Sequence, residues 1–450
     1  MTGWPTDLFA GRRYAVVGLG RNGLPAVHAL RAMGAEVVAW DDRVRPEGLA
    51  VQDPTADIAH FDALVLSPGI PHTLPAPHPI AAAALAAGVP VWSDAELLFR
   101  AVRAAGSRAR FIGVTGTNGK STTTALVAHI LEGAGLAVAA GGNLGPAALA
   151  LPFLDHNGLY VLEMSSYMLE RIGTLRFDAA VMLNLSPDHL DRHGDMTGYA
   201  AAKRAIFARQ RDGDLAVVGL DDVPSRVMAA ELNATTVSGD HEADLWCEAG
   251  VLRDAAGPIL RMAEAQALPG AHNAQNAAAA AAVALHVGVS RADVARGIAS
   301  FTGLPHRQRL VATVDGVPYV DDSKATNADA AARALGCYDR IIWIAGGIAK
   351  AGGAAPLAPF FPRIAHALLI GQDAPMFAAV LADVPHSIVG TLEAAVPAAR
   401  DLAARTGADV VLLSPACASF DQFSGYPARG QRFAELAQGL NAQGLSGGTH

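Results

Sequence analysis

Short apolar runs alternate with alanine-rich stretches through the first hundred residues. The apolar runs cover residues 14–17, 36–40 and 63–66, and the stretch 23–33 between the first two has the composition of a helix. Strand-length runs separated by helical stretches are typical of βαβ units, in which the strands are parallel. The pattern therefore predicts an α/β domain that ends near residue 100, after a helical stretch of mixed charge.

Two further blocks show the same alternation. A strand is expected at residues 111–114, directly before a glycine-rich loop and a helix, and apolar runs again alternate with helical stretches beyond Gly303. A chain of 450 residues is too long for one core, because single cores stop growing at roughly 250 to 300 residues. The expected fold class is α/β, with domains at residues 1–100, 101–303 and 304–450.

Composition and charge narrow the class of protein. Hydrophobic residues make up 51% of the chain and charged residues 17%, which is typical of a soluble globular protein. The formal net charge of −8 gives no long-range attraction for nucleic acid or an acidic membrane, and no apolar run approaches the ~20 residues that span a bilayer. The three cysteines form no CxxC pair, so neither a disulfide framework nor a zinc site is indicated. We expect a cytoplasmic protein that binds neither nucleic acid nor membranes.

The strongest motif is a glycine-rich loop between an expected strand and an expected helix. It consists of Gly116, Thr117, Asn118, Gly119, Lys120, Ser121 and Thr122. Such a loop directs backbone N–H groups and the positive end of a helix at a phosphate, while the lysine neutralises charge and the serine hydroxyl can bind magnesium. The usual pattern has glycine where this chain has Val114, so the match is partial. The loop predicts ATP or GTP binding and leaves open a kinase, a switch GTPase or a ligase.

A second glycine-rich motif, GLGRNG at residues 18–23, follows the first expected strand. Asp41 and Asp42 end the next strand roughly 20 residues later, as a dinucleotide fingerprint requires. The motif alone suggests NAD. The same geometry can hold any diphosphate, so the ligand stays open at this point.

Eight motifs in one order resemble those of the Mur ligases over essentially the whole chain. They are GTNGKST, GNLG, LEMSSYMLE, NLSPDHLDRH, AAKRAIF, GAHNAQNAAAA, LPHR and DDSKATN. The resemblance implies an N-terminal Rossmann-like domain, a central P-loop ATPase domain and a C-terminal Rossmann-like domain, which close on ATP and substrate. DSKATN at residues 322–327 and SPACASFDQF at residues 414–423 are similar to the member that adds D-glutamate to UDP-N-acetylmuramoyl-L-alanine. The implied reaction is ATP-dependent amide ligation through an acyl phosphate, which releases ADP and phosphate during peptidoglycan precursor synthesis.

The resemblance also implies roles for residues at the matching positions. The catalytic residues would be Lys120, Glu163, His189 and Lys203. Besides the loop 116–122, ATP would be bound by Asn273, Arg307 and Asp322. The uridine diphosphate part of the substrate would be bound by Gly20, Arg21, Asn22, Asp42, Arg43, Ser67, Gly69 and Asn143. D-glutamate would be bound by His189, Thr326, Lys350, Ser419, Phe420 and Tyr426.

The implied cofactors are ATP and Mg²⁺, with two ions. The metal ligands would be Ser121, Glu163, His189 and Lys203, the last as a carbamate, since carbamylation turns the lysine cation into an anionic oxygen ligand. Magnesium prefers oxygen ligands, so His189 is not a ligand that its residue type alone would suggest. The loop 346–350 departs from the family's glycine-glycine-aspartate-glycine-lysine form, which affects the expected loop conformation but leaves Lys350 in place. The expected partners are three small substrates, UDP-N-acetylmuramoyl-L-alanine, D-glutamate and ATP, and the protein is expected to be a monomer.

Three other functions remain open from the sequence. A folylpolyglutamate synthetase is a related ligase, and it predicts no site for a uridine nucleotide. An NAD-dependent oxidoreductase fused to a nucleotide-binding module leaves DSKATN and HLDRH without a role. A non-catalytic nucleotide switch predicts ATP turnover that is indifferent to D-glutamate.

Overall fold

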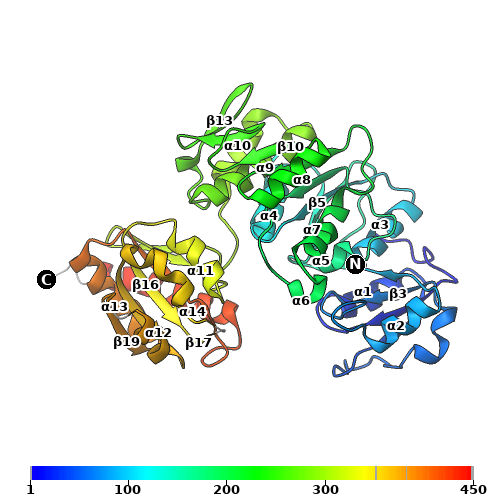
Figure 1. Cartoon of the computed structure of the whole chain (residues 1–450), viewed down its shortest axis with the longest axis horizontal. Helices are drawn as coiled ribbons and strands as arrows, with labels where there is room; N and C mark the ends of the chain where they lie inside the picture. The colour runs from blue at the N-terminus through cyan, green and yellow to red at the C-terminus, as the bar shows by residue number, and fades with distance from the viewer. Residues whose placement is uncertain (1–2, 350–351, 382, 447–450) are drawn as a thin grey trace. The chain divides into compact units, whose positions relative to one another are not determined.

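The protein is described here by a computed structural model that covers residues 3–349, 352–381 and 383–446 (Figure 1). Its residues form two compact units. The first comprises the chain up to Ala265 together with Ala271–Phe301, and the second comprises Gln266–Gly270 and the chain from Thr302 onward. No helix in the described part of the chain is long and apolar enough to cross a membrane.

A four-stranded parallel sheet in the order β2-β1-β3-β4 opens the first unit. Its strands are β1 (Arg13–Val17), β2 (Glu36–Trp40), β3 (Ala63–Leu66) and β4 (Val91–Trp92). The helices of this region are α1 (Gly23–Ala32), η1 (Thr55–His60), α2 (Pro79–Ala86) and α3 (Asp94–Ala104). The strands predicted at 14–17, 36–40 and 63–66 are confirmed, because their apolar side chains form the buried rows of a parallel sheet.

A nine-stranded sheet follows in the order β13-β12-β11-β10-β9-β8-β5-β7-β6. Its strands are β5 (Arg110–Thr115), β6 (Val138–Gly142), β7 (Leu159–Glu163), β8 (Ala179–Met182), β9 (Leu215–Gly219), β10 (Thr235–Ser238), β11 (Leu245–Glu248), β12 (Val251–Asp254) and β13 (Gly257–Arg261). The helical elements are α4 (Lys120–Gly133), η2 (Ala148–Ala150), α5 (Ser166–Leu169), α6 (Leu190–His193), α7 (Met196–Arg204), η3 (Ala205–Phe207), α8 (Val223–Leu232), η4 (Met262–Glu264), α9 (Ala271–His286) and α10 (Arg291–Ser300). Strands β5 to β11 pair in parallel, and β12 and β13 extend the sheet as antiparallel strands.

The alanine-rich stretch of the sequence is the helix α9, which is buried along most of its length. It packs against α4, β9 and β11. Alanine suits this position because its small side chain lets a helix approach its neighbours closely without losing helix propensity.

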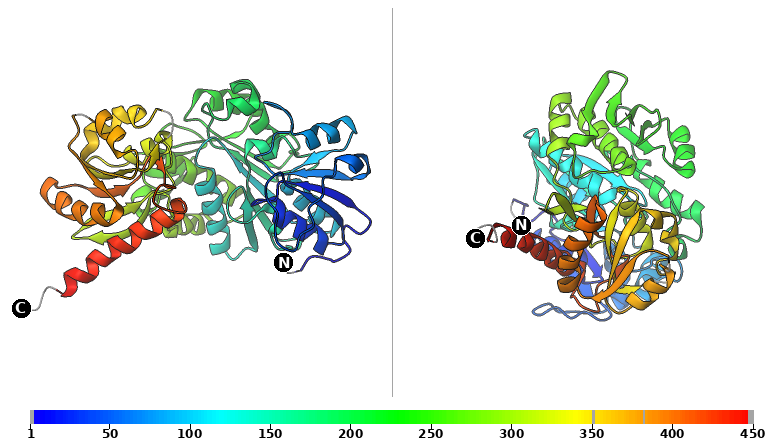
Figure 2. Two further views of the ribbon diagram at one scale, coloured as in Figure 1. Left: turned by 90° about the horizontal axis from the view of Figure 1, so that it is seen from below. Right: turned by 90° about the vertical axis from the view of Figure 1, so that its left-hand side faces the viewer.

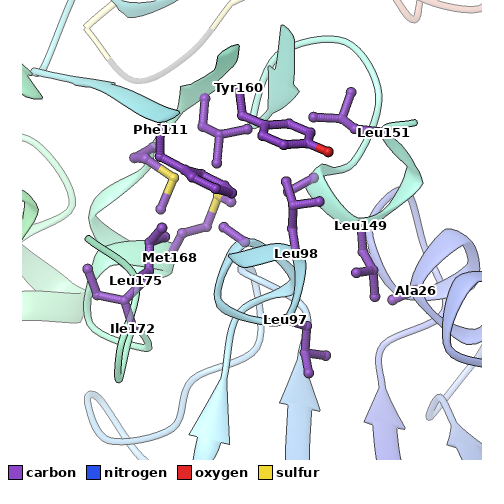
Figure 3. Packing of buried hydrophobic residues seen from close by; sticks show 14 of the residues in the cluster. Ala26, Leu97, Leu98, Phe111, Leu149, Leu151, Tyr160, Met168, Ile172 and Leu175 are labelled. Carbon is purple, nitrogen blue, oxygen red and sulfur yellow. The ribbon is translucent and has the colours of Figure 1, made fainter. Parts of the chain in front are cut away.

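The first two sheets share one hydrophobic core. Phe111 and Tyr160 of the central sheet stack at 4.9 Å between ring centroids, and Leu98 of α3, Leu149 of η2 and Ala26 of α1 belong to the same buried cluster (Figure 3). A common core explains why the first and central blocks form one compact unit, although each has its own sheet.

The second unit contains a six-stranded sheet in the order β14-β15-β20-β16-β18-β19 and a two-stranded pair of β17 and β21. The strands are β14 (Arg309–Val314), β15 (Val317–Asp321), β16 (Ile341–Gly346), β17 (Ile348–Ala349), β18 (Ile364–Ile370), β19 (His386–Gly390), β20 (Val410–Leu413) and β21 (Cys417–Ala418). The helical elements are α11 (Ala328–Leu335), η5 (Ala355–Arg363), α12 (Ala374–Val380), α13 (Leu392–Thr406) and α14 (Tyr426–Ser446). The left view of Figure 2 shows α14 in red as a long terminal helix, which packs against α13 and β14.

Candidate active site

The phosphate loop lies where the sequence places it, between β5 and α4. Gly119 immediately precedes α4 and has a φ of 83°, a conformation that favours glycine. A Cβ at Gly119 would lie 2.4 Å from Oδ1 of Asn276 on α9, so a larger residue does not fit. The positive end of a 14-residue helix therefore points into this loop, as phosphate binding requires.

The loop is held by the segment that follows β8. The backbone N–H of Asn118 donates to Oδ1 of Asn184 at 2.8 Å, and the Asn184 amide donates back to the Asn118 carbonyl at 3.1 Å. The Thr117 hydroxyl lies 3.2 Å from the Tyr199 hydroxyl and accepts a hydrogen bond from the Ser186 N–H at 3.0 Å. These contacts fix the loop conformation before any ligand binds.

Two lysines point at the same carbonyl of the loop. Nζ of Lys120 donates to the carbonyls of Gly116 and Thr117 at 2.9 and 2.8 Å, and Nζ of Lys203 donates to the Gly116 carbonyl at 2.8 Å. Lys203 is 1% exposed. Burial, and then the nearby Lys120 ammonium, lower the pKa of Lys203 well below its usual value. A buried lysine with a lowered pKa is readily available as a neutral amine, which is the form that reacts with carbon dioxide.

Glu163 ends β7, next to the strand that carries the loop. The side chain is 2% exposed, and its Oε1 accepts a hydrogen bond from the Asn143 amide at 2.6 Å. Its Oε2 is buried and has no hydrogen-bond partner among the described residues. A buried carboxylate oxygen without a partner is costly unless a cation binds it, so the site fits a divalent metal. Ser121, the other oxygen ligand predicted from the loop, is also buried.

His189 lies before α6 in a left-handed conformation, with a φ of 53°. Its ring packs 5.0 Å from the ring of Tyr167, and its Nε2 lies 3.4 Å from a carboxylate oxygen of Asp188. Among the described residues there is no group of three or more His, Cys, Asp or Glu side chains that could hold a metal. The predicted metal ligands include only two residues of those types, so a site of the predicted kind depends on Ser121 and on Lys203 as a carbamate.

The N-terminal glycine motif forms a tight strand-to-helix turn. Gly18 has a φ of 91°, and a Cβ at Gly23 would lie 1.8 Å from the Gly18 carbonyl, so only glycine fits there. Ser67 donates to that carbonyl at 2.7 Å, and Asp41 accepts from the Leu19 N–H at 2.7 Å. The residues predicted to bind the uridine diphosphate therefore lie at the carboxyl ends of β1, β2 and β3, where open α/β sheets bind ligands, except Asn143, which follows β6.

The polar side chains near this turn that are predicted to bind the uridine diphosphate differ in their contacts. Arg21 donates to the Gly145 carbonyl at 2.7 Å, and Asn22 donates to the buried Asp94 at 3.1 Å. Asp42 lies 3.1 Å from Nε2 of His78, and Arg43 is exposed. Arg21 thus connects the first glycine motif to the GNLG turn that contains Asn143.

The backbone of the SPGI loop, residues 67–70, is hydrogen-bonded to a buried arginine. Arg171 is 2% exposed and donates to the carbonyls of Leu66, Ser67 and Ile70. Arg192 approaches the Gly69 carbonyl at 3.4 Å. These two guanidinium groups fix the backbone at Ser67 and Gly69, both predicted to bind the sugar nucleotide.

In the second unit, the DSKATN segment begins at the end of β15. Asp322 accepts hydrogen bonds from the Ser414 hydroxyl at 2.8 Å and the Gln308 N–H at 3.3 Å. Asp321 lies 2.7 Å from Nδ1 of His306 in the LPHR segment, which also contains Arg307. The carboxyl ends of the neighbouring strands β15 and β20 therefore bring LPHR, DSKATN and Ser414 together.

The predicted glutamate residues of this unit lie in two segments. Ser419 is buried after β21, whereas the Phe420 side chain is 72% exposed and so does not belong to the core. Tyr426 packs 6.0 Å from the His306 ring, and Thr326 lies within the DSKATN segment. Lys350 lies outside the described residues.

Comparison with known proteins agrees with this geometry. The model of the Mur ligase middle domain matches residues 114–284. A protein of Paramagnetospirillum magneticum named UDP-N-acetylmuramoylalanine--D-glutamate ligase is 48% identical, and the match covers 98% of this chain and 99% of that protein. A protein of the same name from Rhodospirillum rubrum is 46% identical over 97% of this chain and 96% of its own length. The chain belongs to the Mur ligase family.

Solved structures show the same fold at lower identity. The UDP-N-acetylmuramate-alanine ligase MurC of Thermotoga maritima superposes with a TM-score of 0.60 at 19% identity, covering 95% of this chain and 99% of that one. A MurF structure from Acinetobacter baumannii superposes with a TM-score of 0.57 at 18% identity, covering 96% of this chain and 92% of that one. The α/β fold predicted for a Mur ligase is confirmed.

Several residues that shape the sites of this Mur ligase were missed from its sequence. They are Asn184 and Tyr199 at the phosphate loop, Arg171 below the SPGI loop, Arg429 in the second unit and Lys324 in the DSKATN segment. Arg429 is 1% exposed and donates to Ser323 and to the Cys417 carbonyl. Only tertiary structure shows such contacts, because a lone arginine or tyrosine carries no local signal.

Lys324 could have been found from the composition. The sequence has only four lysines among its 34 basic residues, and they are Lys120, Lys203, Lys324 and Lys350. The first three lie in motifs that resemble those of the Mur ligases, and Lys350 ends the loop 346–350. In a chain that otherwise uses arginine, the few lysine positions are a signal for candidate binding residues, because an ammonium and a guanidinium are not interchangeable at a binding site. Nζ of Lys324 lies 5.7 Å from the centre of the Tyr426 ring.

Asp322 is expected to make the folding stability of this Mur ligase depend on pH. Burial raises the pKa of Asp322 to about 7, against the hydrogen bonds from Ser414 and Gln308. Between about pH 4 and pH 7 the unfolded chain has already lost this proton and the folded chain keeps it, so stability falls as the pH rises through this window. Asp322→Asn removes the effect, because the amide is neutral and can still accept from the Gln308 N–H. We expect the variant to gain about 2–3 kcal/mol relative to the wild type between pH 5 and pH 8.

Amide hydrogen exchange in β20 measures this gain within the second unit itself. Asp315→Asn provides the control, because Asp315 pairs with Arg400 on the surface. An equal stability difference between Asp322→Asn and wild type at pH 5 and pH 8 contradicts the prediction.

Proposed function

We propose that this Mur ligase joins D-glutamate to UDP-N-acetylmuramoyl-L-alanine at the expense of ATP. The observation that supports this substrate pair best is 45–48% identity, over nearly the full length of both chains, to relatives named UDP-N-acetylmuramoylalanine--D-glutamate ligase. The N-terminal turn with Ser67, Gly69 and the SPGI loop is suited to a nucleotide diphosphate, which a folylpolyglutamate synthetase does not need. The products are UDP-N-acetylmuramoyl-L-alanyl-D-glutamate, in which both glutamate carboxylates stay free, together with ADP and phosphate, formed in the cytoplasm during peptidoglycan precursor synthesis.

The first step is transfer of the ATP γ-phosphate to the carboxylate of the alanyl end of the sugar nucleotide. In our proposal the backbone N–H groups of residues 116–122 hold the ATP phosphates, and Lys120 balances the negative charge that spreads over the transferring phosphate. Asn273, Arg307 and Asp322 are proposed to contact ATP as well. The acyl phosphate that results is activated because phosphate is a good leaving group.

The second step is attack of the D-glutamate amine on the acyl carbon, with loss of phosphate. Thr326, Lys350, Ser419, Phe420 and Tyr426 are proposed to hold the amino acid, and His189 is proposed to lie near its amine. Magnesium, when bound, would supply charge neutralisation for the phosphates. Glu163, Ser121 and His189 would hold it, together with Lys203 as a carbamate. The buried Glu163 Oε2 and the lowered pKa of Lys203 support these ligands.

The proposed specificity is tested by a substrate panel with release of ADP as the readout. We expect ADP release only when UDP-N-acetylmuramoyl-L-alanine and D-glutamate are both present, because the acyl phosphate needs the first and its turnover needs the second. L-glutamate, L-lysine and diaminopimelate serve as matched amino acids that differ in handedness or side-chain charge. Equal ADP release with L-lysine or diaminopimelate rejects D-glutamate as the substrate, and equal release without any amino acid indicates a nucleotide switch.

A further inference from the structure

The first unit has a basic groove at the end of the central sheet that is opposite the phosphate loop. We call it the arginine groove, and it is lined by Arg103, Arg108, Arg176, Arg209 and Arg211, with Phe99 in its wall. Its cavity volume is about 800 Å³. The arginines precede strands β5, β8 and β9 in the sequence, whereas the phosphate loop follows β5. Since these strands are parallel, the groove lies at their amino ends and the catalytic residues lie at their carboxyl ends.

The positive charge of the groove is largely unbalanced. Arg176 pairs with Asp178 and Asp214, but Arg103, Arg108, Arg209 and Arg211 form no ion pair within the described part of the chain. Two of these four are held by backbone carbonyls. Arg209 donates to Gly173 and Ile172 at 2.6 and 3.0 Å, and Arg103 donates to Ser107 and Ala109 at 3.0 Å each.

Carbonyl contacts fix the direction of a guanidinium group without neutralising it. Arg108 and Arg211 are exposed at the rim of the groove, and their side chains make no hydrogen bond to a carbonyl among the described residues. A chain with a net charge of −8 therefore concentrates oriented positive charge at one place. Such an arrangement favours association with an anionic group.

A second concavity adjoins the arginine groove and has a mixed lining of aromatic and charged side chains. Its volume is about 520 Å³, it shares Phe99, Arg103 and Thr174 with the groove, and its wall includes Phe9 and Trp92. Its other arginines are balanced, because Arg12 pairs with Asp62 and Arg100 pairs with Glu96, each at 2.7 Å. Arg100 lies over the Trp92 ring and Arg103 over the Phe99 ring, so guanidinium groups cover part of these rings. The apolar surface that stays open lies mainly in the wall of the arginine groove itself.

We propose that the arginine groove and the adjoining concavity bind an acidic peptide segment of another protein, with glutamates or aspartates on the arginines and an aromatic side chain on the apolar wall of the groove near Phe99. A small phosphate compound would use the charge, but it would leave the apolar wall of the groove and most of the combined volume without a contact. A membrane surface is flat on this scale and does not enter a concave groove. The partner binds away from the phosphate loop, so ligase turnover and partner binding can occur together.

The test uses the full-length protein and a fluorescently labelled peptide of four glutamates followed by two phenylalanines, with binding followed by fluorescence anisotropy. We expect saturable binding that weakens as salt is raised, because the rim charges are solvent-exposed. Arg108→Glu with Arg211→Glu should weaken binding by at least about 10-fold, since two attractive charges become repulsive. The matched control, Arg31→Glu with Arg261→Glu, makes the same change in net charge at exposed positions outside the groove and should change binding less than about 2-fold.

Further measurements separate the possible ligands and check that the variant is folded. A peptide with four glutamines in place of the glutamates should bind at least about 10-fold more weakly. ADP release by the groove variant should equal that of the wild type, which shows that the protein is folded. Equal loss of binding in the control variant, displacement of the peptide by equimolar inorganic triphosphate, or arginine-dependent binding to phosphatidylglycerol vesicles in preference to the peptide overturns the proposal.

Discussion

Lys120→Ala is expected to lower kcat by about 1,000-fold or more, because the charge that develops on the transferring phosphate is left unbalanced. The structure supports a large effect. Nζ of Lys120 is fixed over the loop by the carbonyls of Gly116 and Thr117, so the cation is already in place when phosphate binds. Preorganised charge stabilises a transition state without the cost of reorienting the side chain. Single-turnover ADP formation measures this step directly.

The control for Lys120→Ala is Arg226→Ala, which removes an exposed cation on α8 of the same unit. We expect its kcat to stay within about 2-fold of wild type. Lys120→Arg should also be strongly impaired, because a guanidinium fork is larger than an ammonium and cannot take the same two carbonyl contacts. Normal turnover in Lys120→Ala would falsify the role of the loop as the ATP phosphate site.

Lys203→Ala is expected to lower kcat by about 100-fold or more and to recover activity when formate or acetate is added. The lysine is buried, contacts the Gly116 carbonyl and has a pKa lowered by burial and by Lys120. If its role is to carry a carbamate, a small carboxylate can enter the space left by the side chain and supply the same anionic oxygens. The magnitude follows from losing one charged group of a preorganised site.

The rescue distinguishes a carbamate from a simple structural lysine. Lys203→Arg keeps a cation but cannot be carbamylated, so it should be inactive and should not respond to formate. Arg204→Ala is the matched control, since Arg204 is the next residue of α7 and pairs with Glu231 at the surface. Full activity of Lys203→Ala without added carboxylate, or rescue by chloride at the same concentration, eliminates the carbamate.

The sequence determined the fold class and the position of both glycine motifs. Buried parallel strands read as continuous apolar runs, and glycines at positive φ, such as Gly18 and Gly119, have no substitute, so these features are visible in local sequence. The roles of Glu163 and Lys203 came from resemblance to the Mur ligases, and they stay predictions. The domain boundaries drawn at residues 100 and 303 also stay predictions, although each of the three large sheets lies within one of the predicted ranges.

Tertiary structure alone decided what surrounds the predicted residues. Lys203 is buried against Gly116, which lies 87 residues away in the sequence. The hydrogen bonds from Arg171 to the SPGI loop join segments about a hundred residues apart. Short-range patterns such as periodicity and turn chemistry carry no information about such pairs, because a side chain's pKa and hydrogen bonds depend on which distant segments pack against it. The sequence by itself therefore fixed which elements form and which family they resemble, and folding decided which charges are buried, balanced or left exposed.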